Sequence, residues 1–250
     1  MLRDCKEEQF EELKAVAYTR LSPNRIILAF ISAFVYSGVT TAVMAFALSY
    51  STTITSAYWP LIQKFDLVLL IVQSLFVLFF ALPRHDYRFQ KLQSIVLCLV
   101  FFKLSVDGYK IYFLTLEDRN SPNELFATGI TILVGGLLLL VLATFRAIRL
   151  VEQGKLTQDG SYLYPVSKET ATRITVILIV IMVIAHIVGR LLGNLNPDVL
   201  GPVSLLVIIS ILQYGMAIAW PEFFLIAYAK LKFPGFILKM PVTRTRKKRD

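Results

Sequence analysis

The chain has 250 residues, of which 56% are hydrophobic and only 17% are charged, and its formal net charge is +9. A soluble domain carries about a quarter charged residues, and its apolar residues form periodic stripes rather than unbroken runs. Here the apolar residues form several blocks of roughly 17 to 25 residues, long enough to cross a hydrocarbon layer about 30 Å thick. These features exclude an ordinary water-soluble domain and predict an all-α, polytopic transmembrane helix bundle.

Residues 1–25 form a polar leader that we expect on the cytoplasmic side. Four of its apolar residues recur at helical spacing: Phe10, Leu13, Val16 and Ala17. This spacing predicts a short amphipathic helix lying on the membrane surface; the alternative is a solvated leader without such a helix. The apolar block that begins at Ile26 is too long for the apolar region of a signal peptide, so we expect it to stay as a signal anchor.

About six spans make up a transmembrane domain over residues 26–230, followed by a basic cytoplasmic tail over residues 231–250. In chain order, the predicted spans are 26–50, 66–83, 92–115, 125–146, 174–194 and 203–229. The fourth span contains Gly129, Gly135 and Gly136. Small residues let helix backbones approach closely, so these glycines predict a helix contact.

The distribution of basic residues predicts the orientation. Most of the 26 Lys and Arg residues lie before the first span, after the second, after the fourth and in the tail. The loops on the other side hold only Lys64 and Arg119. Because cytoplasmic loops carry the excess of Lys and Arg, we expect both termini in the cytoplasm of a cell with the chain in its plasma membrane. Within the long cytoplasmic loop, Asp159-Gly160 predicts a β-hairpin turn.

Charged residues inside the predicted spans are the candidates for a functional site, because burying them in a bilayer is costly. The candidate intramembrane polar cluster comprises Lys103, Asp107, His186, Arg190 and Glu222. Asp107 shares a helix face with Lys103 and a similar depth with Arg190, so we expect it to pair with one of them. Lys103 is also the expected partner of Glu222. The alternatives are a purely structural ion pair, a hydrogen-bonded packing role for His186, an interfacial Glu222, and Lys110 and Arg190 side chains that extend to the membrane surface.

The tail ends in a run of basic residues, namely Arg244, Arg246, Lys247, Lys248 and Arg249. A basic run tethered to a membrane meets anionic lipid head groups first, so we expect these residues to contact anionic lipids rather than nucleic acid. The apolar segment Leu231–Pro241 would hold the tail at the interface. The alternative is that these charges only enforce the orientation of the chain.

No sequence motif indicates a reaction, a cofactor or a metal. Phosphate loops, nucleophile elbows and zinc-binding helices are not found in the sequence, and two cysteines and two histidines make no metal-binding pattern. We therefore expect a membrane component of a transport or export system without its own ATPase, whose partners are other membrane subunits or a cytoplasmic ATPase. One alternative is an accessory, sensor or immunity-type membrane protein that acts through helix contacts. Another is an intramembrane enzyme that acts on lipid-linked substrates.

Overall fold

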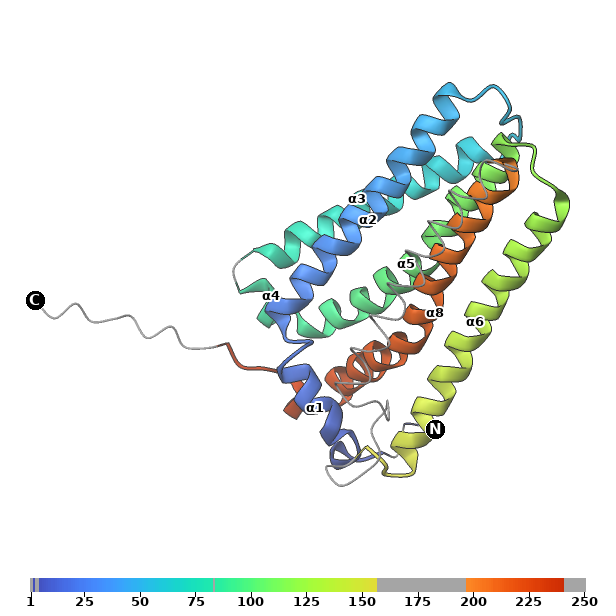
Figure 1. Ribbon diagram of the computed structural model, residues 1–250. Coiled ribbons are helices and arrows are strands. Elements are labelled where there is room, and N and C mark those ends of the chain that lie inside the picture. Colours follow the sequence, from blue (N-terminus) through green and yellow to red (C-terminus); the bar gives the residue numbers. More distant parts are fainter. Residues whose placement is uncertain (1, 3–4, 83, 157–196, 241–250) are drawn as a thin grey trace, which may run out of the picture.

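The computed structural model describes residues 2, 5–82, 84–156 and 197–240 (Figure 1). The described residues contain helices and no strands, in agreement with the predicted all-α class. The elements are η2 (Glu7–Phe10), α1 (Glu11–Tyr18), α2 (Pro23–Tyr50), α3 (Trp59–Ala81), α4 (His85–Arg88), α5 (Gln90–Asp118), α6 (Asn123–Glu152), α8 (Pro197–Lys232) and η3 (Pro234–Phe236).

Four of the described helices are long and apolar enough to cross a membrane: α2, α3, α6 and the Gly201–Lys232 part of α8. They are compatible with a membrane protein. The central helix α5 is not one of the four. The predicted span 174–194 and the predicted turn at Asp159-Gly160 lie outside the described residues. The number of six spans and the cytoplasmic location of both termini stay predictions.

Proline residues set where the long helices begin. Ser22 is extended ahead of α2, and Pro23 occupies the first turn, where its missing N–H costs nothing. Pro60 has the same role in α3. This start, at Trp59 rather than at residue 66, lies about two turns before the start of the predicted span, and the helix ends at Ala81 rather than at residue 83. Helix α6 ends at Glu152, and Gly154, two residues later, takes a left-handed conformation with φ of 67°, which stops the helix.

The long helices form a bundle in which α5 and α8 are central. Figure 1 shows α2 and α3 on one side of this central pair and α6 on the other. Helix α5 packs against α2, α8, α6 and α3, and it is buried along most of its length. Because α5 contacts four other long helices, charged side chains at its buried positions can find partners instead of lipid.

Glycines of α6 accept side chains from the two central helices. A Cβ atom at Gly136 would overlap the side-chain amide of Gln213 on α8, and one at Gly129 would overlap the ring of Tyr112 on α5. The Gln213 amide donates a hydrogen bond of 2.9 Å to the Leu133 carbonyl and accepts one of 2.5 Å from the Tyr109 hydroxyl. The glycine-rich stretch of α6 therefore forms the close helix contact that its sequence predicted.

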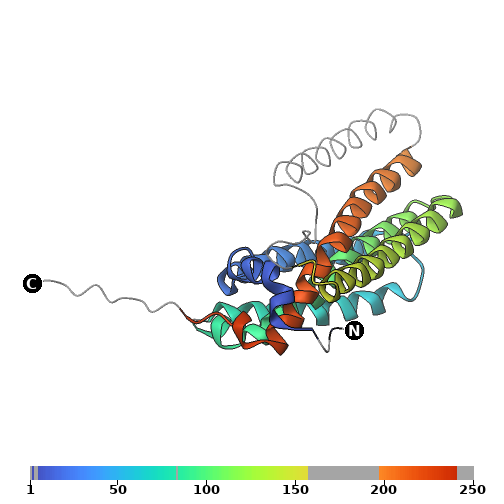
Figure 2. The same cartoon turned by 90° about the horizontal axis from the view of Figure 1, so that it is seen from below.

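The two ends of the bundle differ, and we name them by their chain segments. The loop end holds the α2–α3 connection and the α5–α6 connection, at the top of Figure 1. The terminal end holds η2, α1, α4, η3 and the last turns of α8. Both views place α1 beside the C-terminal part of α8 at this end (Figure 2).

The leader uses its apolar face against protein. Phe10, Leu13 and Ala17 are buried, and the Phe10 ring lies 5.4 Å from the Phe233 ring and 6.4 Å from the Phe236 ring. The amphipathic helix packs on α8 and η3, and its location at the membrane surface stays a prediction. The same contacts bury Phe236 of the apolar segment that we expected at the lipid interface.

Candidate functional site

Four charged side chains meet inside the bundle, and we call Asp66, Lys103, Asp107 and Lys110 the charge cluster. Asp66 comes from α3, and the other three come from α5, where spacings of four and three residues place them on one helix face. Asp66 and Asp107 are only 4% and 6% exposed. The two lysine side chains are 15% and 10% exposed. The cluster thus consists of two carboxylates and two ammonium groups largely shielded by protein.

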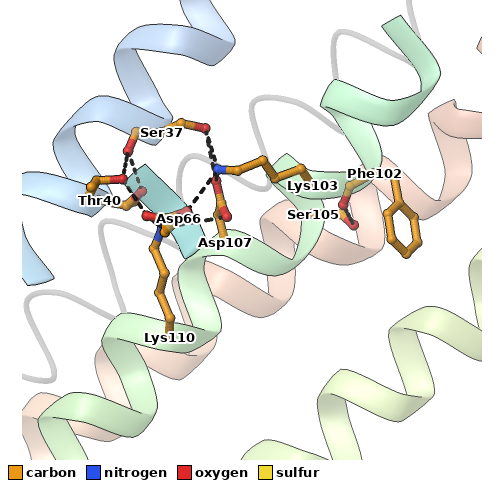
Figure 3. Close-up of polar contacts among 9 residues, drawn as sticks. Ser37, Thr40, Asp66, Phe102, Lys103, Ser105, Asp107 and Lys110 are labelled. Carbon is orange, nitrogen blue, oxygen red and sulfur yellow. Dashed lines mark hydrogen bonds and ion pairs between the residues drawn. The ribbon is translucent and has the colours of Figure 1, made fainter. Parts of the chain in front are cut away.

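Each ammonium group of the charge cluster contacts both carboxylates. Lys103 Nζ forms ion pairs with Asp107 Oδ2 and, at 3.3 Å, with Asp66 Oδ1. Lys110 Nζ forms ion pairs with Asp66 Oδ2 and, at 3.6 Å, with Asp107 Oδ1. Figure 3 shows the two lysines reaching the carboxylates from opposite directions along α5. The formal charge of the four groups sums to zero.

Hydroxyl groups of α2 complete the coordination of the carboxylates. Ser37 Oγ donates to Asp107 Oδ2 at 2.9 Å and accepts from Lys103 Nζ at 3.1 Å. Thr41 Oγ1 donates to Asp66 Oδ2. Ser37 and Thr41 are buried. The site therefore joins three helices, α2, α3 and α5, through side-chain hydrogen bonds and ion pairs.

Two further acidic residues, Glu117 and Asp118, accept hydrogen bonds from the α2–α3 connection at the loop end. Glu117 Oε1 accepts hydrogen bonds from the backbone N–H groups of Thr55 and Ser56, at 3.0 and 2.9 Å, and Glu117 Oε2 accepts one from the Trp59 indole at 2.7 Å. Partial burial favours the neutral carboxyl, but these donors outweigh it and lower the pKa of Glu117 from 4.5 to about 2. The hydroxyls of Ser51 and Thr53 lower the pKa of the neighbouring Asp118 in the same way.

Glu222 does not pair with Lys103, so that expectation is wrong. Its carboxylate instead forms an ion pair with Arg20, which follows α1. The Glu222 side chain is 6% exposed, whereas the Arg20 side chain is 64% exposed. The leader folds back onto α8 and supplies this cation at the terminal end, whereas Lys103 pairs with Asp66 and Asp107. Glu222 therefore lies apart from the charge cluster.

The structure brings together two of the predicted site residues, Lys103 and Asp107. His186 and Arg190 lie outside the described residues, and so does the predicted lipid-binding run Arg244, Arg246, Lys247, Lys248 and Arg249. Sequence reasoning missed Asp66, because the predicted span began at that residue and placed it at the membrane interface. The missed signal was Trp59-Pro60, which marks the true start of α3 two turns earlier.

The four groups of the charge cluster compensate one another's charge, and hydroxyls of α2 add hydrogen bonds to both carboxylates. Among the described residues, no group of three His, Cys, Asp or Glu side chains is placed to bind a metal ion. Breaking one partner of a buried ion pair typically costs about 3–5 kcal/mol, because a charge is left uncompensated. In this cluster each ammonium group has a second carboxylate within 3.6 Å, so an ammonium that loses one partner can pair with the other after a small movement.

Comparisons with known proteins do not assign this chain to a family. No protein-family model, no curated protein and no solved structure matches this chain. The arguments about function therefore rest on the chemistry of its residues.

Proposed function

We propose that this chain is a membrane component of a transport or export system, acting without an ATPase of its own, and that the charge cluster is its proton-coupling site. The proposal also places the protein in the plasma membrane with both termini in the cytoplasm, as the distribution of Lys and Arg predicts. The single observation that carries the proposal is the shared pairing of two carboxylates and two ammonium groups between α3 and α5.

Holding α3 against α5 does not require two carboxylates that share two ammonium groups. One ion pair is enough to hold α3 against α5, and each further buried charge adds desolvation cost. If a proton neutralises Asp66, Lys110 can turn toward Asp107, from which it is already only 3.6 Å away. A change of protonation would then alter the contacts between α3 and α5. This is the link between proton binding and helix movement that a proton-coupled transport component needs.

The test is proton movement across a membrane that contains only this protein. The purified chain would be reconstituted into liposomes that enclose a pH-sensitive dye, and a membrane potential would be imposed. We expect proton flux that falls by at least about tenfold in Asp66→Asn and Asp107→Asn, since each removes one of the two proton-accepting carboxylates. Asp118→Asn is the matched control, because that carboxylate lies at the loop end outside the cluster.

Two results would count against the proposal. One is a wild-type flux no greater than that of liposomes without protein. The other is a flux that Asp66→Asn, Asp107→Asn and Asp118→Asn all leave unchanged. Either result would favour the accessory role, in which the cluster only holds α2, α3 and α5 together.

A further inference from the structure

Four buried side chains lie in a line along one face of α3. Trp59, Asp66, Gln73 and Phe80 are spaced seven residues apart and are the buried residues of this helix. A spacing of seven residues is close to two full turns, so these side chains lie in a line about 10 Å apart along one face. Most other side chains of α3 are exposed to the surroundings of the bundle. The line therefore marks the junction of α3 with α2 and α5.

Gln73 is the unexplained member of this line. It is 4% exposed, and neither Oε1 nor Nε2 of its amide has a hydrogen-bond partner among the residues that the structure describes. A buried amide without partners is unfavourable, and such groups are usually satisfied by protein or by ordered water. Gln73 thus offers both a donor and an acceptor to a small polar ligand inside the bundle.

The position of Gln73 along the junction follows from contacts on either side of it. Asp66 meets α2 at Thr41, and Phe80 meets α2 at Phe30, where the ring centroids lie 5.5 Å apart. Because α2 and α3 are antiparallel, Gln73 lies level with the turns of α2 between Ala33 and Ser37. It is therefore on the terminal-end side of the charge cluster, next to the level of Ser37.

Apolar layers close the junction beyond both polar layers. At the terminal end, Phe30 and Phe80 are stacked and almost fully buried, and Phe76 stacks on Phe80 at 6.1 Å. At the loop end, Met44, Trp59 and Leu114 form a second buried group. The Trp59 indole is also held by Glu117. The loop-end layer is fixed by that charged hydrogen bond, whereas apolar contacts alone hold the phenylalanine stack.

We propose that Gln73 binds water that connects the charge cluster with the terminal end, and that the Phe30–Phe80 stack closes this path at rest. The inference deepens the proposed function, on which it rests, by naming the proton, carried through bound water, as the ion that reaches Asp66 and Asp107. Among the described residues, the unpartnered amide of Gln73 lies on the terminal-end side of the cluster, and the loop-end side has no such buried amide. In the resting arrangement protons therefore reach the cluster from that side, while the loop-end layer is closed.

The test measures water access to residue 73 and does not require transport. In a variant with Cys5 and Cys98 replaced by Ala, Gln73→Cys would be exposed to a membrane-impermeant cationic thiol reagent from each side. Glu8→Cys and Thr52→Cys, both at exposed positions, mark the terminal end and the loop end. Leu75→Cys is the matched control on α3, because that side chain is 60% exposed on the outer surface of the bundle and would face lipid.

We expect residue 73 to react from the terminal end about tenfold faster than from the loop end, because only a hydrated thiol ionises and reacts. Phe80→Ala should raise the terminal-end rate by about another tenfold, since it removes one ring of the stack. Met44→Ala should leave that rate unchanged. Faster reaction from the loop end, or reaction no faster than that of Leu75→Cys even with Phe80→Ala, would overturn the inference.

A second variant covers the case in which Gln73→Cys does not fold. Gln73→Leu removes the unpartnered amide while keeping the size of the side chain. If the amide only holds water, the thermal midpoint should stay the same or rise while proton flux falls. A lowered thermal midpoint would show that the amide has a structural partner, and the inference would be wrong. If the wild type carries no proton flux, the proposed function fails, but the labelling rates still decide whether water reaches residue 73.

Discussion

Asp66 on α3 and Lys110 on α5 form an ion pair although 44 residues separate them in the chain, and each has a second partner of opposite charge within 3.6 Å. Removing one member therefore leaves an excess charge inside the bundle, whereas removing both leaves Lys103 and Asp107 paired.

This arrangement predicts a non-additive mutant series. Asp66→Leu leaves two ammonium groups with one carboxylate and should lower the free energy of unfolding by about 3–5 kcal/mol. Adding Lys110→Leu should recover at least half of that loss, because an apolar pair of similar size can replace a buried ion pair. Denaturant unfolding in detergent measures both values. Losses that simply add in the double variant would show that the two side chains do not interact.

Much of this site could have been predicted from local spacing, and part of it was. The pairing of Lys103 with Asp107 followed from their separation of four residues on one helix. Asp66 was missed because its charge suggested the edge of a span, although the Pro60 signal placed the start of the helix earlier. A hydropathy profile places the end of a predicted span at a charged residue. It cannot indicate that another helix carries a partner of opposite charge.

The contact between Arg20 and Glu222 shows where sequence reasoning reaches its limit. The expected partner of Glu222 was Lys103, a charge inside another predicted span. The leader's apolar residues were correctly read as one helical face, but the same face fits a membrane surface or a protein surface. Only the fold shows that Phe10 packs on Phe233 and Phe236 and so brings Arg20 to Glu222.

The ion pair between Arg20 and Glu222 predicts that substituting Arg20 alone lowers stability more than substituting both residues. Arg20→Ala should cost about 1–3 kcal/mol of stability, because it leaves the Glu222 carboxylate buried without a cation. Adding Glu222→Gln should restore part of the loss by removing the buried charge. Thermal unfolding in detergent measures the series, with Arg25→Ala as a control, since that exposed arginine also lies near the start of α2. An Arg20→Ala variant as stable as the wild type would contradict the ion pair.

Glu117 predicts a pH-dependent loop end. Glu117→Gln replaces one acceptor oxygen by an amino group, so it should release Trp59 or the 55–56 backbone and cost about 1–3 kcal/mol. The pKa is lowered in the folded chain, so this contribution is present above the ordinary value of 4.5 and is lost as the pH falls toward about 2.

Trp59 fluorescence in a Trp220→Phe variant reports this change. We expect a red-shifted emission in Glu117→Gln at neutral pH and a similar shift in the unsubstituted loop near pH 2, with Glu124→Gln as the exposed control. An emission wavelength that changes neither with Glu117→Gln nor at pH 2 would show that Glu117 does not bind the Trp59 indole.

Two glycines predict opposite effects of the same substitution. At Gly136 a Cβ atom would overlap the amide of Gln213 and force it away from the Leu133 carbonyl and the Tyr109 hydroxyl. Gly136→Ala should therefore cost about 1–3 kcal/mol through overpacking and lost hydrogen bonds. At Gly38 on α2 nothing lies within 4 Å of the added atom, and glycine inside a helix is about 0.5–1 kcal/mol less favourable than alanine. Gly38→Ala should thus leave stability unchanged or raise it. Urea unfolding of the two variants in the same detergent gives the comparison, and equal effects at both positions would refute the close packing of α6 on α8.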